Sequence, residues 1–130
     1  MKQITVLFAF LFTCSLHLSA QQPDAILPGA WKGTSICQVK NSPCHDEVVV
    51  YHISKGKKSG EYTVLANKIV NGIEEEMGTI QFMFDEKQSE LTGSFRTDDT
   101  WKFKLSGNKL DGTLYVKGVL YRIINLQKIK

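Results

Sequence analysis

The stretch that decides the fold, residues 100–116, reads TWKFKLSGNKLDGTLYV. Its first half alternates large apolar residues with lysines, so that one side of an extended chain carries Trp101, Phe103 and Leu105 and the other side carries the lysines. A turn at Gly107-Asn108 leads into a second alternating run. Two such runs joined by a short turn predict an antiparallel β-hairpin with one buried face.

Alternating runs joined by short turns continue from this hairpin to both ends of the chain. Every connection is short enough for an antiparallel hairpin and leaves no room for a crossover helix. The sequence therefore predicts an all-β fold, an eight-stranded antiparallel up-and-down (meander) barrel whose closure removes exposed edges. The expected strands span residues 31–39, 45–54, 61–70, 73–84, 90–97, 100–106, 110–116 and 119–129.

Glycines within the expected strands predict local irregularities. Gly78 interrupts the fourth strand, and we expect a β-bulge near it. Gly93 and Gly112 fall on the inward register, where a missing side chain leaves room for a large neighbour.

The first residues of the chain have the three-part layout of a secretory signal peptide. Lys2 is followed by an apolar run over residues 4–12 and by small residues up to Ala20. The run is too short to span a membrane, and the residues before Cys14 do not fit a lipoprotein acylation site, so we expect no transmembrane segment and no lipid anchor. The predicted organisation is a signal peptide (1–20), an extended N-terminal arm (21–28) and a single barrel domain (29–130), exported to the periplasm or secreted.

Charge and cysteine content narrow the range of partners. The chain has 16 basic and 13 acidic residues, and removal of Lys2 with the leader leaves 15 against 13. This dispersed balance predicts no nucleic-acid partner. Cys37 and Cys44 are the cysteines that remain after cleavage, and an oxidising compartment favours a disulfide between them.

Residues near the two ends of the barrel carry a resemblance to a known family. Gly29-x-Trp31 on the first strand and Arg122 on the last resemble the calycin superfamily of lipocalin-like barrels. In that family the tryptophan lies at the closed end and a late basic residue packs across it, so the resemblance implies that Trp31 and Arg122 close the barrel. The chain lacks the long first loop and C-terminal helix of true lipocalins, and its length is closer to avidin-like barrels and small periplasmic protease inhibitors.

The polar residues of the chain give little support to enzymatic chemistry. Cys37, Cys44, His45 and His52 match no short paired-ligand zinc motif, and a disulfide would remove both thiolates. No phosphate loop, dinucleotide fingerprint or serine elbow occurs. We therefore expect no catalytic residue, metal or cofactor.

Three hypotheses for function stay open. The first is a binding protein for a small, partly apolar ligand at the open mouth of the barrel. The second is a protein-binding barrel, such as a protease inhibitor, that acts through the arm 21–28 or through the disulfide loop 37–44. The third is a packed scaffold that contacts another envelope protein. The candidate ligand-binding residues are Phe82, Phe84, Phe95, Trp101 and Phe103, with hydroxyls at the rim from Tyr62 and Tyr115.

Overall fold

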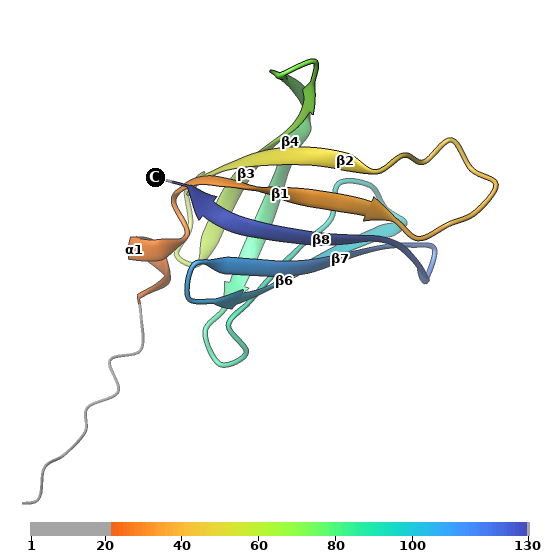
Figure 1. Cartoon of the computed structure of the whole chain (residues 1–130). Helices are drawn as coiled ribbons and strands as arrows, with labels where there is room; N and C mark the ends of the chain where they lie inside the picture. Colours follow the sequence, from red (N-terminus) through yellow and green to blue (C-terminus); the bar gives the residue numbers. More distant parts are fainter. Residues whose placement is uncertain (1–21, 130) are drawn as a thin grey trace, which may run out of the picture.

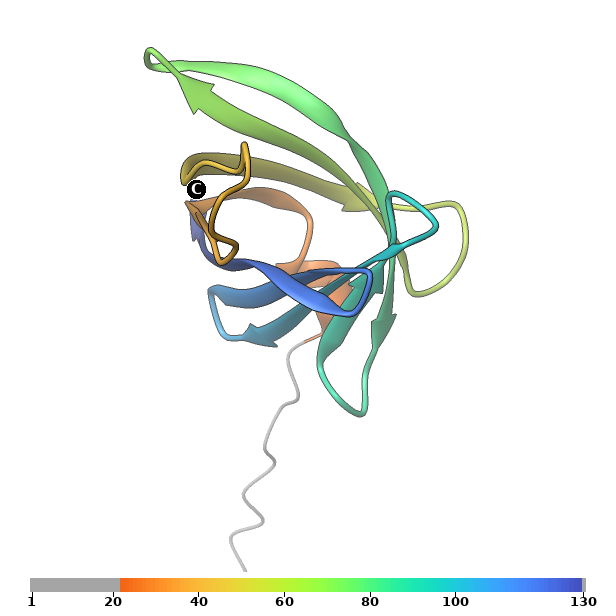
Figure 2. The same cartoon turned by 90° about the vertical axis from the view of Figure 1, so that its right-hand side faces the viewer.

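The computed structural model describes residues 22–129, and the predicted leader, including Cys14, lies outside them. Eight antiparallel strands form a closed barrel in which each strand lies beside its neighbours in the sequence (Figures 1 and 2). The predicted up-and-down barrel is therefore confirmed. The strands are β1 (Gly29–Cys37), β2 (Glu47–Lys55), β3 (Glu61–Val70), β4 (Ile73–Asp85), β5 (Glu90–Gly93), β6 (Asp99–Ser106), β7 (Lys109–Val116) and β8 (Val119–Ile129).

Alternation along the strands builds the interior. In β6, Phe103 is buried, whereas Lys102 and Lys104 are exposed, as the sequence predicts. The inward glycines make room for rings, because a Cβ on Gly112 would come within 2.3 Å of Phe103 and a Cβ on Gly93 within 2.8 Å of Phe82. A glycine at each position thus lets a phenylalanine cross the barrel axis.

Two register shifts between paired strands change the direction in which residues face at one end of the barrel. Gly78 pairs with Ala66 and Glu76 pairs with Asn67, so Met77 is the extra residue of a bulge, as expected near Gly78. A second register shift, between β7 and β8, leaves Tyr121 without a partner in the sheet ladder. Tyr121 is partly buried and packs against the core.

The expected fifth strand, 90–97, is too long. β5 ends at Gly93, and residues 94–98 form a loop instead. The Asp99 carboxylate holds this loop by accepting hydrogen bonds from the Phe95 and Arg96 backbone N–H groups, at 2.8 and 3.1 Å. These bonds replace the sheet bonds that a longer strand would make.

The N-terminal arm is folded, contrary to the prediction of an extended segment. Pro23–Ile26 form the short helix α1 beside the start of β1 (Figure 1), and Leu27 is fully buried in the core cluster. The indole N–H of Trp31 donates a 2.9 Å hydrogen bond to the Leu27 carbonyl. Leu27 therefore closes this end of the barrel. Burying its apolar side chain there stabilises the folded arm relative to an extended arm that would leave the side chain in water.

Trp31 lies at this closed end, but the expected contact with Arg122 is wrong. β1 and β8 run antiparallel, so Trp31 pairs with Lys128, and Arg122 pairs with Cys37 six residues further along β1, about 20 Å away. The Lys128 ammonium lies 5.7 Å from the centroid of the Trp31 ring and donates to the Ile26 carbonyl. Lys128 thus makes the basic contact that we expected from Arg122.

Cys37 and Cys44 form the predicted disulfide, with their Cα atoms 5.9 Å apart. The loop that they close lies at the end of the barrel opposite α1 (Figure 1). Arg122 lies at this end too, where it borders a cavity.

Candidate functional site

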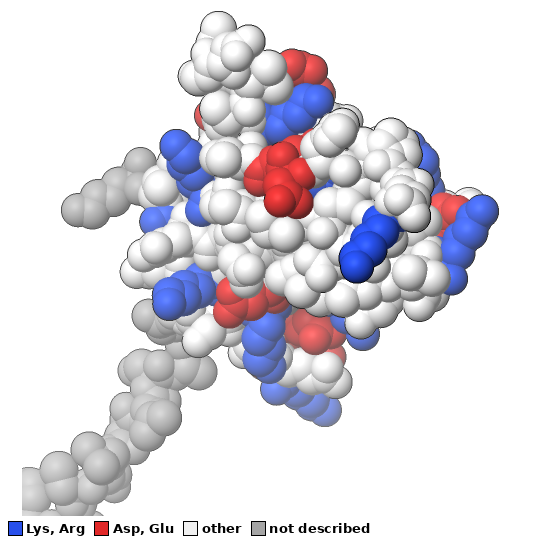
Figure 3. Space-filling view, turned by 45° about the vertical axis from the view of Figure 1, so that its right-hand side comes forward, with Lys and Arg blue, Asp and Glu red and all other residues white. Residues whose placement is uncertain are grey.

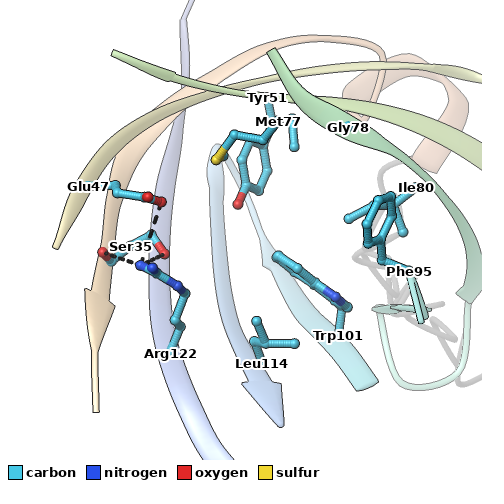
Figure 4. Close-up of a pocket in the computed structure, with 11 residues that line it drawn as sticks. Ser35, Glu47, Tyr51, Met77, Gly78, Ile80, Phe95, Trp101, Leu114 and Arg122 are labelled. Carbon is cyan, nitrogen blue, oxygen red and sulfur yellow. Dashed lines mark hydrogen bonds and ion pairs between the residues drawn. The ribbon is translucent and has the colours of Figure 1, made fainter. Parts of the chain in front are cut away.

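A cavity of about 200 Å³ opens at the end of the barrel opposite α1 (Figure 4). Residues from β1, β2, β3, β4, β6, β7 and β8 and from the loop after β5 surround it. Below it the core side chains pack together, and a void that they leave between the strands holds only about 10 Å³. The lining residues are Ser35, Glu47, Tyr51, Ala66, Met77, Gly78, Ile80, Phe95, Trp101, Leu114 and Arg122.

Packed rings form the floor of the cavity. Tyr51 meets Phe103 edge-to-face with ring centroids 6.2 Å apart, and Phe103 meets Phe82 at 5.8 Å. Such edge-to-face pairs fix the rings in place. The cavity thus has a firm floor and does not extend down the whole barrel axis.

One wall of the cavity is apolar. The bulge in β4 brings Met77 and Gly78 to the mouth, and the Asp99 loop brings Phe95 there from the other side. Phe95 is half exposed, at 51%, and Trp101 lies opposite Arg122 across the cavity (Figure 4). An apolar body placed here would lose its contact with water on several sides.

The facing wall carries a charged pair. Nη1 of Arg122 donates to the carbonyl of Ser35 (3.3 Å), to its hydroxyl (3.2 Å) and to the carbonyl of His45 (2.9 Å). A Glu47 carboxylate oxygen lies 3.6 Å from the same nitrogen. Both side chains are largely buried, with 12% and 23% of their surface exposed. Arg122 therefore joins β1, β2 and β8 at the mouth and is compensated by Glu47.

Tyr51 projects its hydroxyl into the cavity between these two walls (Figure 4). The residue is only 3% exposed, and its hydroxyl takes part in none of the side-chain hydrogen bonds between residues 22–129, although it is not one of the buried atoms left without a partner there. Burial raises the pKa of Tyr51 far above its ordinary value, the Glu47 carboxylate raises it further and Arg122 opposes the rise. The hydroxyl is therefore protonated at neutral pH and is available as a donor.

A second hollow of about 310 Å³ adjoins the first at the same end and shares Phe95, Trp101 and Leu114 with it. Tyr121, turned inward by the β8 bulge, lines its far side. Asp99 lies there as well. Burial alone would raise the pKa of Asp99, but the hydrogen bonds from Arg96, Phe95 and Ser94 outweigh burial and hold that pKa below its ordinary value.

The candidate ligand residues are divided by the structure. Phe95 and Trp101 line the cavity. Phe82 and Phe103 are buried beneath it in the core. The other three lie elsewhere: Tyr62 is buried at the closed end and donates to Asp24 of α1, Phe84 packs edge-to-face on Tyr62 at 6.4 Å, and Tyr115 projects outward from β7 at 39% exposure.

Sequence reasoning missed Tyr51, Met77, Glu47 and the true position of Arg122. The run around Tyr51 is apolar on both faces of β2, so alternation gave no sign of its direction. Arg122 carried a signal, because it shares a register with buried Ile124. Because the first and last strands are antiparallel, a residue near the start of the last strand lies beside the end of the first strand. A cation on the buried register at that position therefore lies at the open end of the barrel.

His52 and the two cysteines lie outside the cavity. His52 faces outward and donates from Nε2 to the Glu74 carboxylate at 2.7 Å, while Cys37 and Cys44 are bonded to each other. Among residues 22–129, no three His, Cys, Asp or Glu side chains gather in a way that would hold a metal ion. The same part of the chain contains no helix that is long and apolar enough to cross a membrane.

No protein-family model matches the sequence, and no curated protein matches it. The charge of the surface does not indicate a partner either, because acidic and basic side chains are interspersed on the face shown in Figure 3. Function must therefore be inferred from the geometry of the open end.

Proposed function

We propose that this protein binds a small, partly apolar ligand at the open end of its barrel and is not an enzyme. The observation that carries the proposal is the cavity of about 200 Å³, with its wall of Met77, Ile80, Phe95, Trp101 and Leu114. An apolar protein cavity of about 150 Å³ holds a benzene molecule. The space here suits a ligand with one ring and a short substituent.

The resemblance to the calycin superfamily remains part of this proposal. Lys128 over Trp31 supports it, since the family places a late basic residue across the tryptophan of the closed end. A barrel sealed at one end by Leu27 and α1 leaves the other end as the entrance for a ligand. Export to the periplasm or beyond is proposed as well, and the Cys37–Cys44 disulfide is compatible with it.

Protein binding, as in a protease inhibitor, has less support. The arm that was to enter a protease cleft is packed on the barrel: Lys55 lies 2.9 Å from the Asp24 carboxylate, and Leu27 is fully buried. Removing residues 21–27 should therefore unfold the closed end. The disulfide loop between β1 and β2 is the remaining candidate contact surface.

A nuclear magnetic resonance titration tests ligand binding directly. The two tryptophans give two indole N–H signals, one from Trp31 at the closed end and one from Trp101 in the cavity. We expect ethylbenzene to shift the Trp101 signal and to leave the Trp31 signal in place. The signal that disappears in Trp101→Phe belongs to Trp101, and the signal that stays belongs to Trp31.

A filled cavity provides the matched control. Ala66 lines the cavity from β3, and Ala66→Leu should abolish the shift because the longer side chain occupies the space of the ligand. Thr113→Leu, on the outer face of β7, adds similar bulk away from the cavity and should leave the shift unchanged. Equal shifts of both indoles, or an unaltered titration in Ala66→Leu, would remove the proposal.

A further inference from the structure

Three groups at the cavity wall indicate what kind of ligand fits, and the inference rests on the proposed function. They are the Tyr51 hydroxyl, the free side of the Arg122 guanidinium and the Glu47 carboxylate (Figure 4). We infer that the cavity takes an uncharged ligand whose ring packs against Trp101 and whose single hydrogen-bond acceptor, such as a carbonyl oxygen, is bound by Tyr51 beside Arg122.

The Tyr51 hydroxyl is the first of these groups. It takes part in none of the side-chain hydrogen bonds between residues 22–129, and it is not one of the buried atoms left without a partner there, which are Asn67 Oδ1 and Trp101 Nε1. Although the residue is only 3% exposed, its hydroxyl thus keeps access to the space of the cavity. A ligand atom can reach it there. A protonated phenol beside a cation meets an acceptor on the ligand more favourably than a donor.

The Arg122 guanidinium is the second group. All of its hydrogen bonds within residues 22–129 come from Nη1, which leaves Nη2 and Nε without a protein acceptor. The side chain lies on the cavity wall, so these remaining N–H groups also favour an acceptor on the ligand. Tyr51 and Arg122 thus present donors from two strands, β2 and β8.

The balance of charge at the open end decides the charge of the ligand. Glu47 already compensates Arg122 at 3.6 Å, and Asp98 and Asp99 line the adjoining hollow together with Arg96. The residues that line the two hollows thus carry three carboxylates against two guanidinium groups. A ligand carboxylate would lose its hydration here and gain no net positive charge in exchange. An uncharged acceptor avoids that cost.

The test compares three one-ring probes with different substituents: acetophenone (an uncharged acceptor), ethylbenzene (no acceptor) and benzoate (an anion). Each is titrated while the Trp101 indole signal is followed, in the natural protein and in Tyr51→Phe. We expect the substitution to weaken acetophenone binding about fivefold, the size of one lost hydrogen bond, and to change ethylbenzene binding by less than about twofold. Benzoate should bind more weakly than acetophenone to the natural protein.

Tyr115→Phe is the matched control, because it removes a hydroxyl from a side chain that faces outward from β7. It should leave both affinities unchanged. Tyr51→Phe itself should keep or raise the melting temperature, since the hydroxyl that it removes has no protein partner, and this separates lost recognition from lost folding.

The remaining outcomes are separable. Equal effects of Tyr51→Phe on acetophenone and ethylbenzene, or tighter binding of benzoate than of acetophenone, would overturn this inference and leave the proposed function standing. If none of the three probes shifts the Trp101 signal, the proposed function fails, and this inference fails with it.

Discussion

At the scale of single residues, Leu27 lies at the point where the segment before β1 meets the closed end of the barrel. Its side chain is fully buried in the core cluster at the closed end, and its carbonyl accepts a hydrogen bond from the Trp31 indole N–H. A residue just before the first strand therefore seals the barrel. The same residue explains why the segment before β1 is folded and not free.

Truncation of this side chain gives the first prediction. Leu27→Ala should lower the free energy of unfolding by about 2–5 kcal/mol, because it removes buried methyl groups and leaves a cavity. Urea denaturation followed by tryptophan fluorescence measures the loss. Met83→Ala, at a half-exposed position on the outer face of β4, is the control and should cost far less. Equal losses in the two variants would mean that Leu27 does not seal the barrel.

Asp99 is the second residue with a defined task, since its carboxylate orders the loop that carries Phe95. Its pKa in the folded protein is lowered, so its contribution to stability is present above the pKa of the unfolded chain and is lost as the pH falls through the folded value. Asp99→Asn should therefore cost about 1–2 kcal/mol at pH 7. Denaturation at pH 7 and at pH 2 should give a difference between the two proteins that is smaller in acid. A pH-independent difference would assign the effect to packing and not to the charge.

At the scale of elements, the β3–β4 hairpin extends beyond the barrel (Figure 1), and the Glu74 carboxylate connects it to β2. Glu74 accepts hydrogen bonds from His52 on β2 and from Asn67 on β3, both at 2.7 Å. Met77, the bulge residue at the cavity mouth, lies on the same strand three residues further on. The contact thus fixes the strand that carries part of the apolar wall.

Loss of this contact gives the third prediction. Glu74→Ala should speed amide hydrogen exchange over residues 69–74, while Glu75→Ala, which removes an adjacent exposed carboxylate, should not. The His52 and Asn67 hydrogen bonds lower the pKa of Glu74, so the contact is intact at neutral pH and is lost as the pH falls through that lowered value. Unchanged exchange in Glu74→Ala would show that the hairpin is held by its sheet bonds alone.

Most strands could be predicted from the sequence, and the predictions that were wrong, the length of the fifth strand and the conformation of the arm, have physical causes. β3 and β8 have their predicted bounds, because turns at residues 71–72 and 117–118 and regular alternation specify them. The strand expected through Thr97 ends at Gly93, because Asp99 offers the backbone an alternative set of hydrogen bonds. The arm was predicted to be extended, since nothing local shows that Leu27 fills the barrel end.

The candidate site was less predictable than the strands. Aromatic residues on inward registers identified Phe95 and Trp101, but the same signal selected Phe82 and Phe103, which are core. Period-two alternation tells which side a residue faces and not how far along the barrel axis it lies. That depth depends on strand register, which here places Lys128, and not Arg122, beside Trp31.

At the scale of the whole molecule, the barrel has two ends with different tasks. One is sealed by α1, Leu27 and Trp31, and the other holds an apolar cavity faced by the Arg122–Glu47 pair. The packed rings between the two ends separate them, since the void there holds only about 10 Å³. A ligand at the proposed site would therefore lie near the surface and would not replace the core.

The most direct measurement of the central claim is native mass spectrometry of the protein purified without denaturation from the cells that make it. The account predicts the folded chain with one small organic molecule bound, and loss of that molecule in Ala66→Leu, which fills the cavity from β3. A chain that carries no small molecule, or one whose bound molecule is retained unchanged in Ala66→Leu, would contradict the account.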